Sequence, residues 1–460
     1  MTTATVRASG IAGVGRLRPV RRPARPGAAL AVIVFGGLNV GAVVAVAAHG
    51  ASELGGGAAE TLTFAGRVAG LFAELFVVGQ LFLAARIPAL ERRVGQDSLL
   101  RWHRVLGQVT LAVVVVHPLL IAAGYGGARV GGFLTQSKEL VTTYVAASVA
   151  ALLIVVAAGL SIGAARRRLP YEVWYAVHLA TYAAVILAFG HQLSSGSDLE
   201  NSRVIAWWWK GQLALAAGCL VAFRLGLPVA RSARHGVQVR SVVQESSGAV
   251  SIYFTGRRLD RLAAAGGQFF IWRFLTRNGW WEAHPYSLSA TPTRYQMRIT
   301  VGIVGKGTQR LAQLKPGTRV LVEGPYGTFT DDSRTRGKVL LIGAGLGITP
   351  LRALLEDTPP QVNVVLLHRV GQAEQAVLTH ELGPIIEARG GRAHLVTGPR
   401  GAPDDPNRLM GPAHLRYLVP DIRRRDVYLC GPAGFCTATA ATLRGMGVPA
   451  QRVHHETFAI

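Results

Sequence analysis

The first half of the chain is a series of long apolar segments separated by short polar ones, and the second half alternates short apolar runs with turn residues. About 20 consecutive apolar residues can cross a bilayer as a helix. We expect six such helices, over residues 28–49, 62–85, 102–124, 139–162, 172–192 and 206–228. The pattern therefore predicts a six-helix transmembrane domain over residues 28–230, preceded by an arginine-rich cytoplasmic tail over 1–27.

The first apolar segment has two interpretations. Its Ala-rich end, AVAAHGA, resembles the cleavage site of a signal peptide. The apolar run is long for a signal peptide, however, and five further spans follow it. We therefore favour an uncleaved helix.

Beyond Pro228 the hydrophobic period shortens. Between residues 233 and 334, short β-rich runs separated by Gly and Pro predict a small antiparallel β-barrel. After Arg336, strand–turn–helix units predict an α/β domain with a parallel sheet over residues 337–460. The fold class is thus a multidomain membrane protein with two soluble-type domains after its helices.

Basic residues are concentrated in alternate connections between the expected spans, at 86–104 and 164–171. By the positive-inside rule these connections face the cytoplasm, which predicts a multi-pass protein of the cell membrane with both termini cytoplasmic. The chain carries 49 Lys and Arg against 25 Asp and Glu, for a net charge of +24. Without a basic-aromatic patch, this excess predicts contact with membrane lipid and no nucleic-acid partner. Three cysteines are too few for a disulfide framework or a four-thiolate iron–sulfur site.

Four histidines lie inside the apolar segments. His103 and His117 are fourteen residues apart in one segment, and His178 and His191 are thirteen apart in another. These spacings correspond to roughly 21 and 20 Å along a helix, so each helix would hold one histidine near each leaflet. Two such helices side by side offer the ligand pairs of two stacked bis-histidine haems. The alternative is that each histidine only bonds a neighbouring helix.

The angular phase of the second helix differs from that of the first. Fourteen residues return to within roughly 40° of the same face, whereas thirteen miss it by roughly 140°. We therefore expect the helix that carries His191 to be distorted near Gly190 or to end before that histidine.

A glycine turn follows the first strand of the expected α/β domain. Gly343, Gly345 and Gly347 come after an apolar run and precede a helical one. Such a turn brings backbone N–H groups and a helix N-terminus close to a pyrophosphate. The spacing departs from G-x-G-x-x-G, so a plain turn is the alternative.

Three further motifs are HPYSLSATP at 284–292, CGP at 430–432 and the terminal HHETFAI at 454–460. With the glycine turn, their order is similar to that of the ferredoxin–NADP reductase superfamily. With the four membrane histidines before them, the chain from about residue 60 onward resembles the transmembrane NADPH oxidase/ferric reductase family. The resemblance implies hydride transfer from NADPH to FAD and electron transfer through two b-type haems.

The resemblance also implies roles for particular residues. Tyr286 would lie against the isoalloxazine and Ser287 near its N5. Cys430 would lie beside the nicotinamide, and Glu456 and Phe458 would be the C-terminal acid and the flavin-stacking aromatic. Ser287, Cys430, Glu456 and Phe458 form the expected catalytic set, and Tyr286 is an expected cofactor contact. The remaining cofactor contacts would be His284, Pro285, Gly305, Lys306, Gly307, Thr308, Gly431 and Pro432.

For the membrane half, the resemblance implies that His103 and His178 ligate the cytoplasmic-side haem and His117 and His191 the outer one. Arg67 and Arg86 would be cationic partners of the haem propionates, although Arg86 also suits a plain interface anchor. Oxidases of this family often have a further histidine where this chain has Ile121. That departure puts oxygen as the acceptor in doubt.

The second strand of the α/β domain ends in His368 and Arg369 and carries no acid for the ribose hydroxyls. We expect Arg369 to contact a 2′-phosphate, which favours NADPH, with NADH possible. The alternative is a solvated arginine at a strand end.

Three functions follow from these patterns. The first is a transmembrane oxidoreductase that moves electrons from cytosolic NAD(P)H through FAD and two haems to a small-molecule acceptor, either a ferric chelate or oxygen giving superoxide. The second is a membrane-tethered flavin reductase with structural histidines. The third is a non-enzymatic haem anchor subunit, against which the flavin motif argues. The sequence leaves the oligomeric state open.

Overall fold

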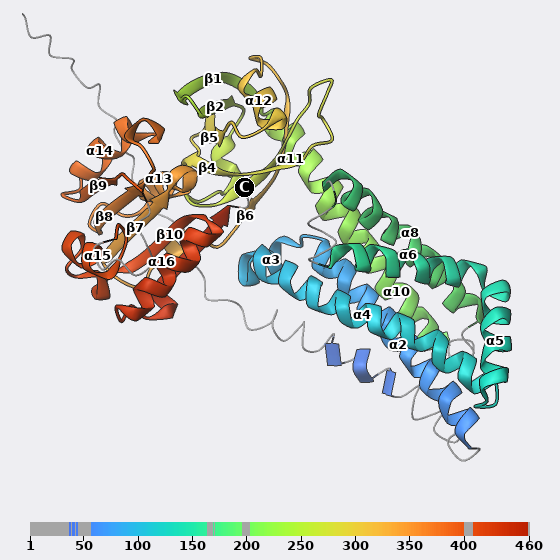
Figure 1. The fold of residues 1–460 in the computed structure, drawn as a ribbon. Coiled ribbons are helices and arrows are strands. Elements are labelled where there is room, and N and C mark those ends of the chain that lie inside the picture. Colours follow the sequence, from blue (N-terminus) through green and yellow to red (C-terminus); the bar gives the residue numbers. More distant parts are fainter. Residues whose placement is uncertain are drawn as a thin grey trace, which may run out of the picture.

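A computed structural model describes residues 36–37, 39–41, 43–44, 57–162, 169, 171–195, 203–399 and 408–458. The tail over 1–27, most of the first expected span and the arginines at 166–168 lie outside the described residues. The described chain divides into a helical half (residues 57–235), an antiparallel domain (238–333) and a parallel domain (338–458). Figure 1 shows the helices on one side and the two sheet domains together on the other.

The helical half is built from long apolar helices joined by short connections. Four described helices are long and apolar enough to cross a membrane, and a bent pair could add a fifth. Its elements are α2 (Ala58–Ala84), α3 (Pro88–Val94), α4 (Gln96–Tyr125), α5 (Val130–Thr143), α6 (Val145–Ser161), α8 (Tyr171–Ser195), α10 (Arg203–Leu220), a π-helical stretch (Val221–Gly226) and α11 (Leu227–His235).

Two expectations about these helices are wrong. The span expected over 139–162 starts later, because α5 and α6 meet at an angle of 99° at Tyr144, whose φ of −109° and ψ of 54° interrupt the helix. Helix α8 continues as an α-helix through Gly190 to Ser195, so the expected distortion before His191 is not found. His191 therefore lies on a different face of α8 from His178.

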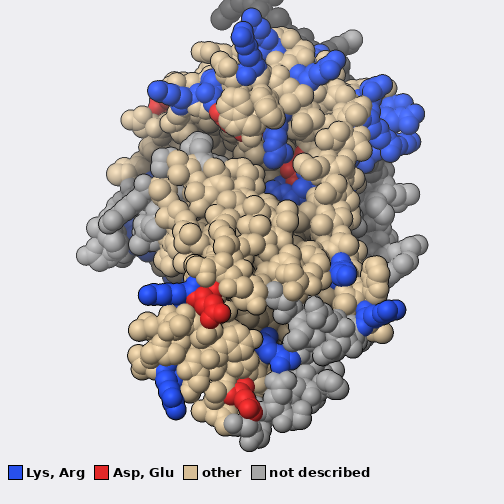
Figure 2. All heavy atoms as spheres, turned by 90° about the vertical axis from the view of Figure 1, so that its right-hand side faces the viewer, with Lys and Arg blue, Asp and Glu red and all other residues tan. Residues whose placement is uncertain are grey.

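The outer surface of the helical half is apolar. Val105 on α4, Ile186 on α8 and Leu225 in the π-helical stretch are 55%, 72% and 63% exposed. Figure 2, which views the molecule from the α5 side, shows a mainly uncharged surface with scattered Lys and Arg. A soluble protein rarely exposes so much apolar area, which supports a membrane protein.

The antiparallel domain is one six-stranded sheet with strand order β1-β2-β5-β4-β3-β6. The two edges approach each other at one end, through an isolated bridge between Gln238 and Arg319 and the backbone hydrogen bonds beside it, but the sheet does not close. The closed barrel expected from the sequence is therefore not confirmed. The strands are β1 (Gln238–Ser246), β2 (Ala249–Thr255), β3 (Phe269–Phe274), β4 (His284–Ala290), β5 (Gln296–Gly302) and β6 (Val320–Tyr326), with helix α12 (Lys306–Ala312) after β5.

The parallel domain has five strands in the order β11-β10-β7-β8-β9, with every neighbouring pair parallel. Apolar runs such as VLLI in β7 are buried on both faces, as expected for strands covered by helices on each side. The strands are β7 (Lys338–Ala344), β8 (Asn363–Arg369), β9 (Arg392–Val396), β10 (Asp426–Pro432) and β11 (Val453–Phe458), and the helices are α13 (Ile348–Asp357), α14 (Thr379–Glu387), α15 (Pro412–Leu418) and α16 (Ala433–Gly445).

Candidate functional site

The glycine turn lies at the carboxyl end of β7, where a parallel sheet holds its ligands. Gly345 has a left-handed φ of 54°, which favours glycine. A Cβ on Gly347 would lie 2.1 Å from the carbonyl oxygen of Cys430, so this position has no room for a side chain. The two glycines let the turn pack against β10 and start α13 at Ile348.

A cavity of about 930 Å³ opens beside this turn, between the antiparallel and parallel domains. Its volume lies in the range of cofactor sites. The cavity brings together residues that are far apart in sequence, and the predicted site residues that line it are Pro285, Tyr286, Ser287, Thr308, Gly345, Gly347, Arg369, Pro432 and Phe458. The predicted residues that do not line it are His284, Gly305, Lys306, Gly307, Gly343, Cys430, Gly431 and Glu456.

The flavin motif forms strand β4, which orders its side chains. The rings of His284 and Tyr286 stack in parallel with centroids 5.8 Å apart. Trp272 Nε1 donates a hydrogen bond of 3.1 Å to the carbonyl of Tyr286. Burial, with a smaller contribution from Glu282, raises the pKa of the Tyr286 phenol to about 12, so this ring stays neutral. Ser287 is buried and lines the cavity.

Strands β10 and β11 bring the remaining predicted catalytic residues to the same edge. In their parallel register Cys430 is opposite Glu456, and Pro432 is opposite Phe458. Cys430 is fully buried, and this burial raises the pKa of its thiol well above the ordinary value. A neutral, enclosed thiol is no nucleophile. Phe458 lines the cavity, whereas Cys430 does not and lies behind Gly347, which does.

Arg369 lines the cavity, but its guanidinium group is already bonded to the protein. Its Nη1 donates to the carbonyls of Val370 and Val396, and its Nη2 donates to those of Gly398 and Pro399. The side chain is 9% exposed. It therefore holds the loop after β9 at the rim of the cavity, and contact with a 2′-phosphate stays a prediction.

In the helical half, His103 on α4 and His178 on α8 form a proximal pair on the side of the sheet domains. Their ring centroids are 6.1 Å apart and their planes are inclined at 74°. Trp174 stacks on the His178 ring at 5.2 Å, and Gln80 Nε2 donates to the His103 carbonyl at 3.0 Å. Within the described part of the chain, neither Nδ1 atom has a hydrogen-bond partner although both are buried.

His117 and His191 form a distal pair on the same two helices. The Nδ1 atom of His117 donates to the Gly66 carbonyl on α2 at 2.7 Å, which leaves the lone pair on Nε2. A Cβ on Gly70 would lie 2.9 Å from His117 Cε1, so the ring packs directly on the α2 backbone. The His191 ring packs edge-on against Tyr144 at 5.0 Å and is within electrostatic range of His117.

The two predicted propionate partners have different surroundings. Arg67 is half-buried on α2. Arg86, just after α2, donates to Glu323 of strand β6. Arg224 in the π-helical stretch lies within electrostatic range of both His103 and His178. Sequence reasoning missed Arg224, Glu323 and the glycines beside His117, although an arginine inside an apolar span was a usable signal.

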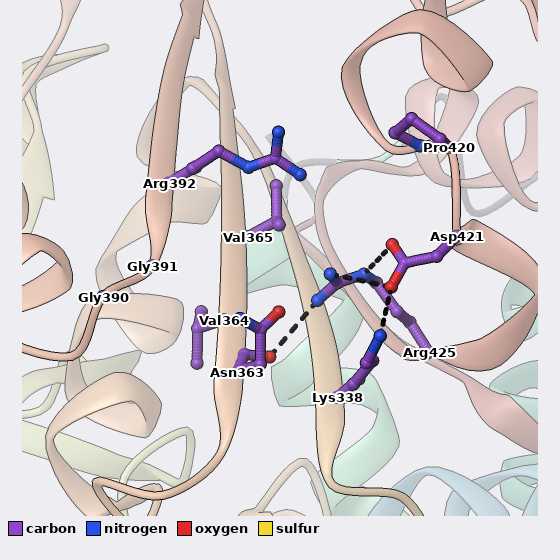
Figure 3. A pocket seen from close by; sticks show the side chains of 10 residues that line it. All are labelled: Lys338, Asn363, Val364, Val365, Gly390, Gly391, Arg392, Pro420, Asp421 and Arg425. Atoms are coloured by element: carbon purple, nitrogen blue, oxygen red, sulfur yellow. Dashed lines mark hydrogen bonds and ion pairs between the residues drawn. The ribbon is translucent and has the colours of Figure 1, made fainter.

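A second cavity, of about 300 Å³, lies at the opposite edge of the parallel sheet. Figure 3 shows Asp421 paired with Lys338 and Arg425, and Arg425 also bonded to the Asn363 carbonyl. These groups satisfy one another and tie β7 and β8 to the loop before β10, so we assign no ligand here. Among the described residues, no group of three or more His, Cys, Asp or Glu side chains could hold a metal ion by itself.

Comparison with known proteins agrees with both halves. Residues 69–189 match the family described as "Ferric reductase like transmembrane component". The chain is 32% identical over 238 residues to the ferredoxin reductase component of 3-ketosteroid-9-alpha-monooxygenase from Mycolicibacterium smegmatis, covering 48% of this chain and 65% of that protein. It is 30% identical over 187 residues to a flavohemoprotein of Vibrio cholerae, covering 38% and 46%.

Among solved structures, the FAD/NAD-binding domain of a nitric oxide dioxygenase from Vibrio cholerae has a TM-score of 0.40 at 24% identity, covering 48% of this chain and 98% of that one. The chain spans between 46% and 65% of the length of the two curated relatives above. The protein thus joins a ferric reductase-like transmembrane region to a reductase module of the ferredoxin reductase type, which confirms the predicted fusion.

Proposed function

We propose that the protein is a transmembrane oxidoreductase that moves electrons from NAD(P)H through FAD and two bis-histidine b-type haems to an acceptor on the other side of the membrane. The observation that carries this proposal is the spacing of His103 and His178. With metal–nitrogen bonds of about 2 Å, two imidazoles on opposite sides of one iron have centroids about 6 Å apart. The observed 6.1 Å fits that arrangement.

The chemistry of the donor set also fits haem. The proximal pair offers imidazole nitrogens from two helices, and the N–H of His117 is directed to a carbonyl, as in ligating histidines. Haem would supply one-electron redox chemistry, with His103 and His178 holding one haem and His117 and His191 the other. Arg224 places a positive charge near the proximal pair.

In the reductase module, the chain's own residues bind and orient the nucleotides, while FAD supplies hydride acceptance and one-electron release when bound. The turn at Gly345–Gly347 presents backbone N–H groups at the start of α13. Tyr286, Ser287 and Phe458 line the same cavity and would enclose the flavin ring. Cys430 and Gly431 support the turn from behind, because their backbone lies directly against Gly347.

Under this proposal the sheet domains are cytoplasmic, as the distribution of arginines predicts. The acceptor is a ferric chelate or oxygen. Ile121, which packs against Gly66 on α2, stands where oxidases often have a histidine, and this difference argues against oxygen. A membrane-tethered flavin reductase with structural histidines is the second candidate, since His117 makes the helix-to-helix hydrogen bond expected of such a residue.

The experiment uses the full-length protein in sealed vesicles with NADPH outside and ferric chelate or oxygen inside. We expect low-spin b-type haem spectra on reduction with dithionite, and NADPH-driven reduction of the enclosed acceptor. Inhibition of enclosed cytochrome c reduction by superoxide dismutase would identify oxygen. A purified protein that holds flavin but no haem would refute the proposal and favour the tethered flavin reductase.

A further inference from the structure

A buried carboxylate joins the antiparallel domain to the helical half. Glu323 on β6 is 3% exposed and accepts three hydrogen bonds. Arg86 Nη1, from the end of α2, lies 2.5 Å from its Oε1, and Tyr326 Oη donates to the same oxygen at 3.0 Å. Arg273 Nη1, on the neighbouring strand β3, lies 3.2 Å from Oε2. One of the three donors therefore comes from the helical half and two come from the domain itself.

The same strand is held at two further points. Arg231 on α11 donates to the Gly324 carbonyl, and the backbone N–H of Val322 donates to Ser232 Oγ at 3.0 Å. The Arg86 guanidinium also lies over the Tyr326 ring, 5.4 Å from its centroid. Strand β6 is thus the part of the antiparallel domain that is fixed to α2 and α11.

Arg86 is well placed to fix the orientation of the antiparallel domain relative to α2. It follows α2 directly and has a left-handed φ of 57°, so the surrounding structure holds its backbone in an unusual conformation. Two turns earlier on α2, Gln80 donates to the carbonyl of His103, one of the proximal pair. Helix α2 therefore links the proximal histidines to the carboxylate of β6.

We propose that the Arg86–Glu323 ion pair is a positioning contact that fixes the flavin domain relative to the proximal histidine pair, and so sets the rate of electron transfer between them. The inference rests on the proposed function. A buried ion pair contributes little net stability but strongly penalises an arrangement that separates its partners, because each would then be a buried, unpaired charge. Electron-transfer rates fall exponentially with distance, so a small displacement of the domain has a large effect on this step.

The pair also explains the role of Arg86 better than a propionate contact. The contacts of the Arg86 guanidinium with the Glu323 carboxylate and the Tyr326 ring are both with the antiparallel domain. The two roles give different outcomes on mutation. A propionate role makes only Arg86 important, and a positioning role makes Arg86 and Glu323 interdependent.

The test uses the full-length protein in nanodiscs with Glu323→Gln, Arg86→Gln and the charge exchange Arg86→Glu/Glu323→Arg. Two rates are measured after mixing with NADPH: ferricyanide reduction, which reports the reductase module, and b-type haem reduction. Glu323→Gln should leave the first within about twofold and slow the second at least tenfold. The charge exchange should recover part of the haem reduction rate. Arg273→Gln is the matched control, because it removes a donor to the same carboxylate from within the domain, and it should slow haem reduction far less.

Hydrogen exchange at residues 84–95 and 320–328 provides a readout that does not depend on haem. Exchange there should rise in Glu323→Gln and Arg86→Gln and stay near wild type in Arg273→Gln. Unchanged exchange together with unchanged haem reduction in Glu323→Gln would overturn the proposal. Slower haem reduction in Arg86→Gln alone would assign Arg86 to a propionate instead. A wild-type protein without haem would refute the proposed function, while the exchange measurement would still test the contact.

Discussion

The imidazole rings of His103 on α4 and His178 on α8, 75 residues apart in the sequence, lie edge to face with their centroids 6.1 Å apart and their planes inclined at 74°. Helix α6 packs on both α4 and α8, and it holds these two helices so that their histidines approach each other. This relationship supports a single iron held between them. Because His117 and His191 are not part of this contact, removing His178 should leave them unaffected.

We therefore expect His178→Ala to remove the proximal haem and retain the distal one, because His117 and His191 keep their own contacts. Haem content per protein should fall by about half, measured by the pyridine haemochrome assay. His380→Ala, at an exposed histidine of the parallel domain, is the control and should keep the full content. Loss of both haems, with a folded protein, would mean that the pairs are not independent.

Arg224 should raise the reduction potential of the proximal haem. A nearby positive charge favours the state with one more electron, so Arg224→Gln should lower the midpoint potential by an amount on the order of tens of millivolts. Spectroelectrochemical titration of the purified protein measures this shift. Lys210→Gln is the control, because Lys210 is exposed on α10 above the Trp207 ring. Equal shifts in both variants would show that the effect is not local to Arg224.

Much of the arrangement could be predicted from the sequence because it depends on local patterns. Apolar length gave the helices, and the fourteen-residue spacing placed His103 and His117 at two levels of one helix. The glycine turn and the flavin motif were each confined to a few residues, so their places at the end of β7 and within β4 followed from the pattern of strands. Residues of both motifs line the cavity between the two sheet domains.

The contacts that could not be predicted join distant residues. Arg86 and Glu323 are 237 positions apart, and nothing local distinguishes this glutamate from others at strand positions. The 99° bend at Tyr144 is another example, because no Gly or Pro marks this position and the ring of Tyr144 packs against His191 of a distant helix. The surroundings of Arg369 could not be predicted either, because its bonds to four carbonyls depend on the loop after β9, and its contact with a 2′-phosphate stays a prediction.

The choice between NADPH and NADH can be tested at Gly371, which lines the cavity just beyond the end of β8. No acid stands at the end of this strand to accept the ribose hydroxyls. Gly371→Asp should lower kcat/KM for NADPH about tenfold by repelling a 2′-phosphate, and should raise it for NADH. Gly371→Asn has the same size without the charge and should change the preference little. A wild type that prefers NADH would contradict the expectation at once.

Glu91 on α3 should make stability depend on pH. The side chain is 7% exposed, and its burial raises its pKa from 4.5 to about 7, an effect that Arg86 opposes and Glu323 reinforces. Because the folded state holds this proton more tightly than the unfolded state, stability is greatest below about pH 4.5 and falls as the pH rises towards 7. The loss is on the order of 3 kcal/mol.

Thermal unfolding of the full-length protein between pH 4.5 and 8 measures the effect of Glu91. Glu91→Gln should flatten the dependence, and Glu60→Gln, at an exposed acid in the first turn of α2, should leave it unchanged. A wild type whose stability rises steadily over this range, with no change in Glu91→Gln, would contradict the expectation.

Glu381 on α14 should be needed to hold the two sheet domains together. It accepts hydrogen bonds from Arg298 on β5 at 2.5 and 3.0 Å and from Arg352 on α13 at 2.7 Å. Burial alone would raise the pKa of Glu381, but the two arginines outweigh it and hold this pKa below 4.5. The folded state therefore binds the proton more weakly, and the stabilisation is present above pH 4.5 and lost as the pH falls through the lowered pKa.

Glu381→Gln should lower the free energy of unfolding at pH 7 by about 3 kcal/mol, because Arg298, only 4% exposed, would keep a buried charge without its carboxylate. Chemical denaturation followed by flavin fluorescence measures this loss, and the variant should also be less sensitive to acid than the wild type. Glu374→Gln changes an exposed acid of the same domain and serves as the control. A loss no larger than that of the control would mean that the domains are held by apolar contacts, and that Arg298 is sufficiently satisfied by Ser289 and Tyr253.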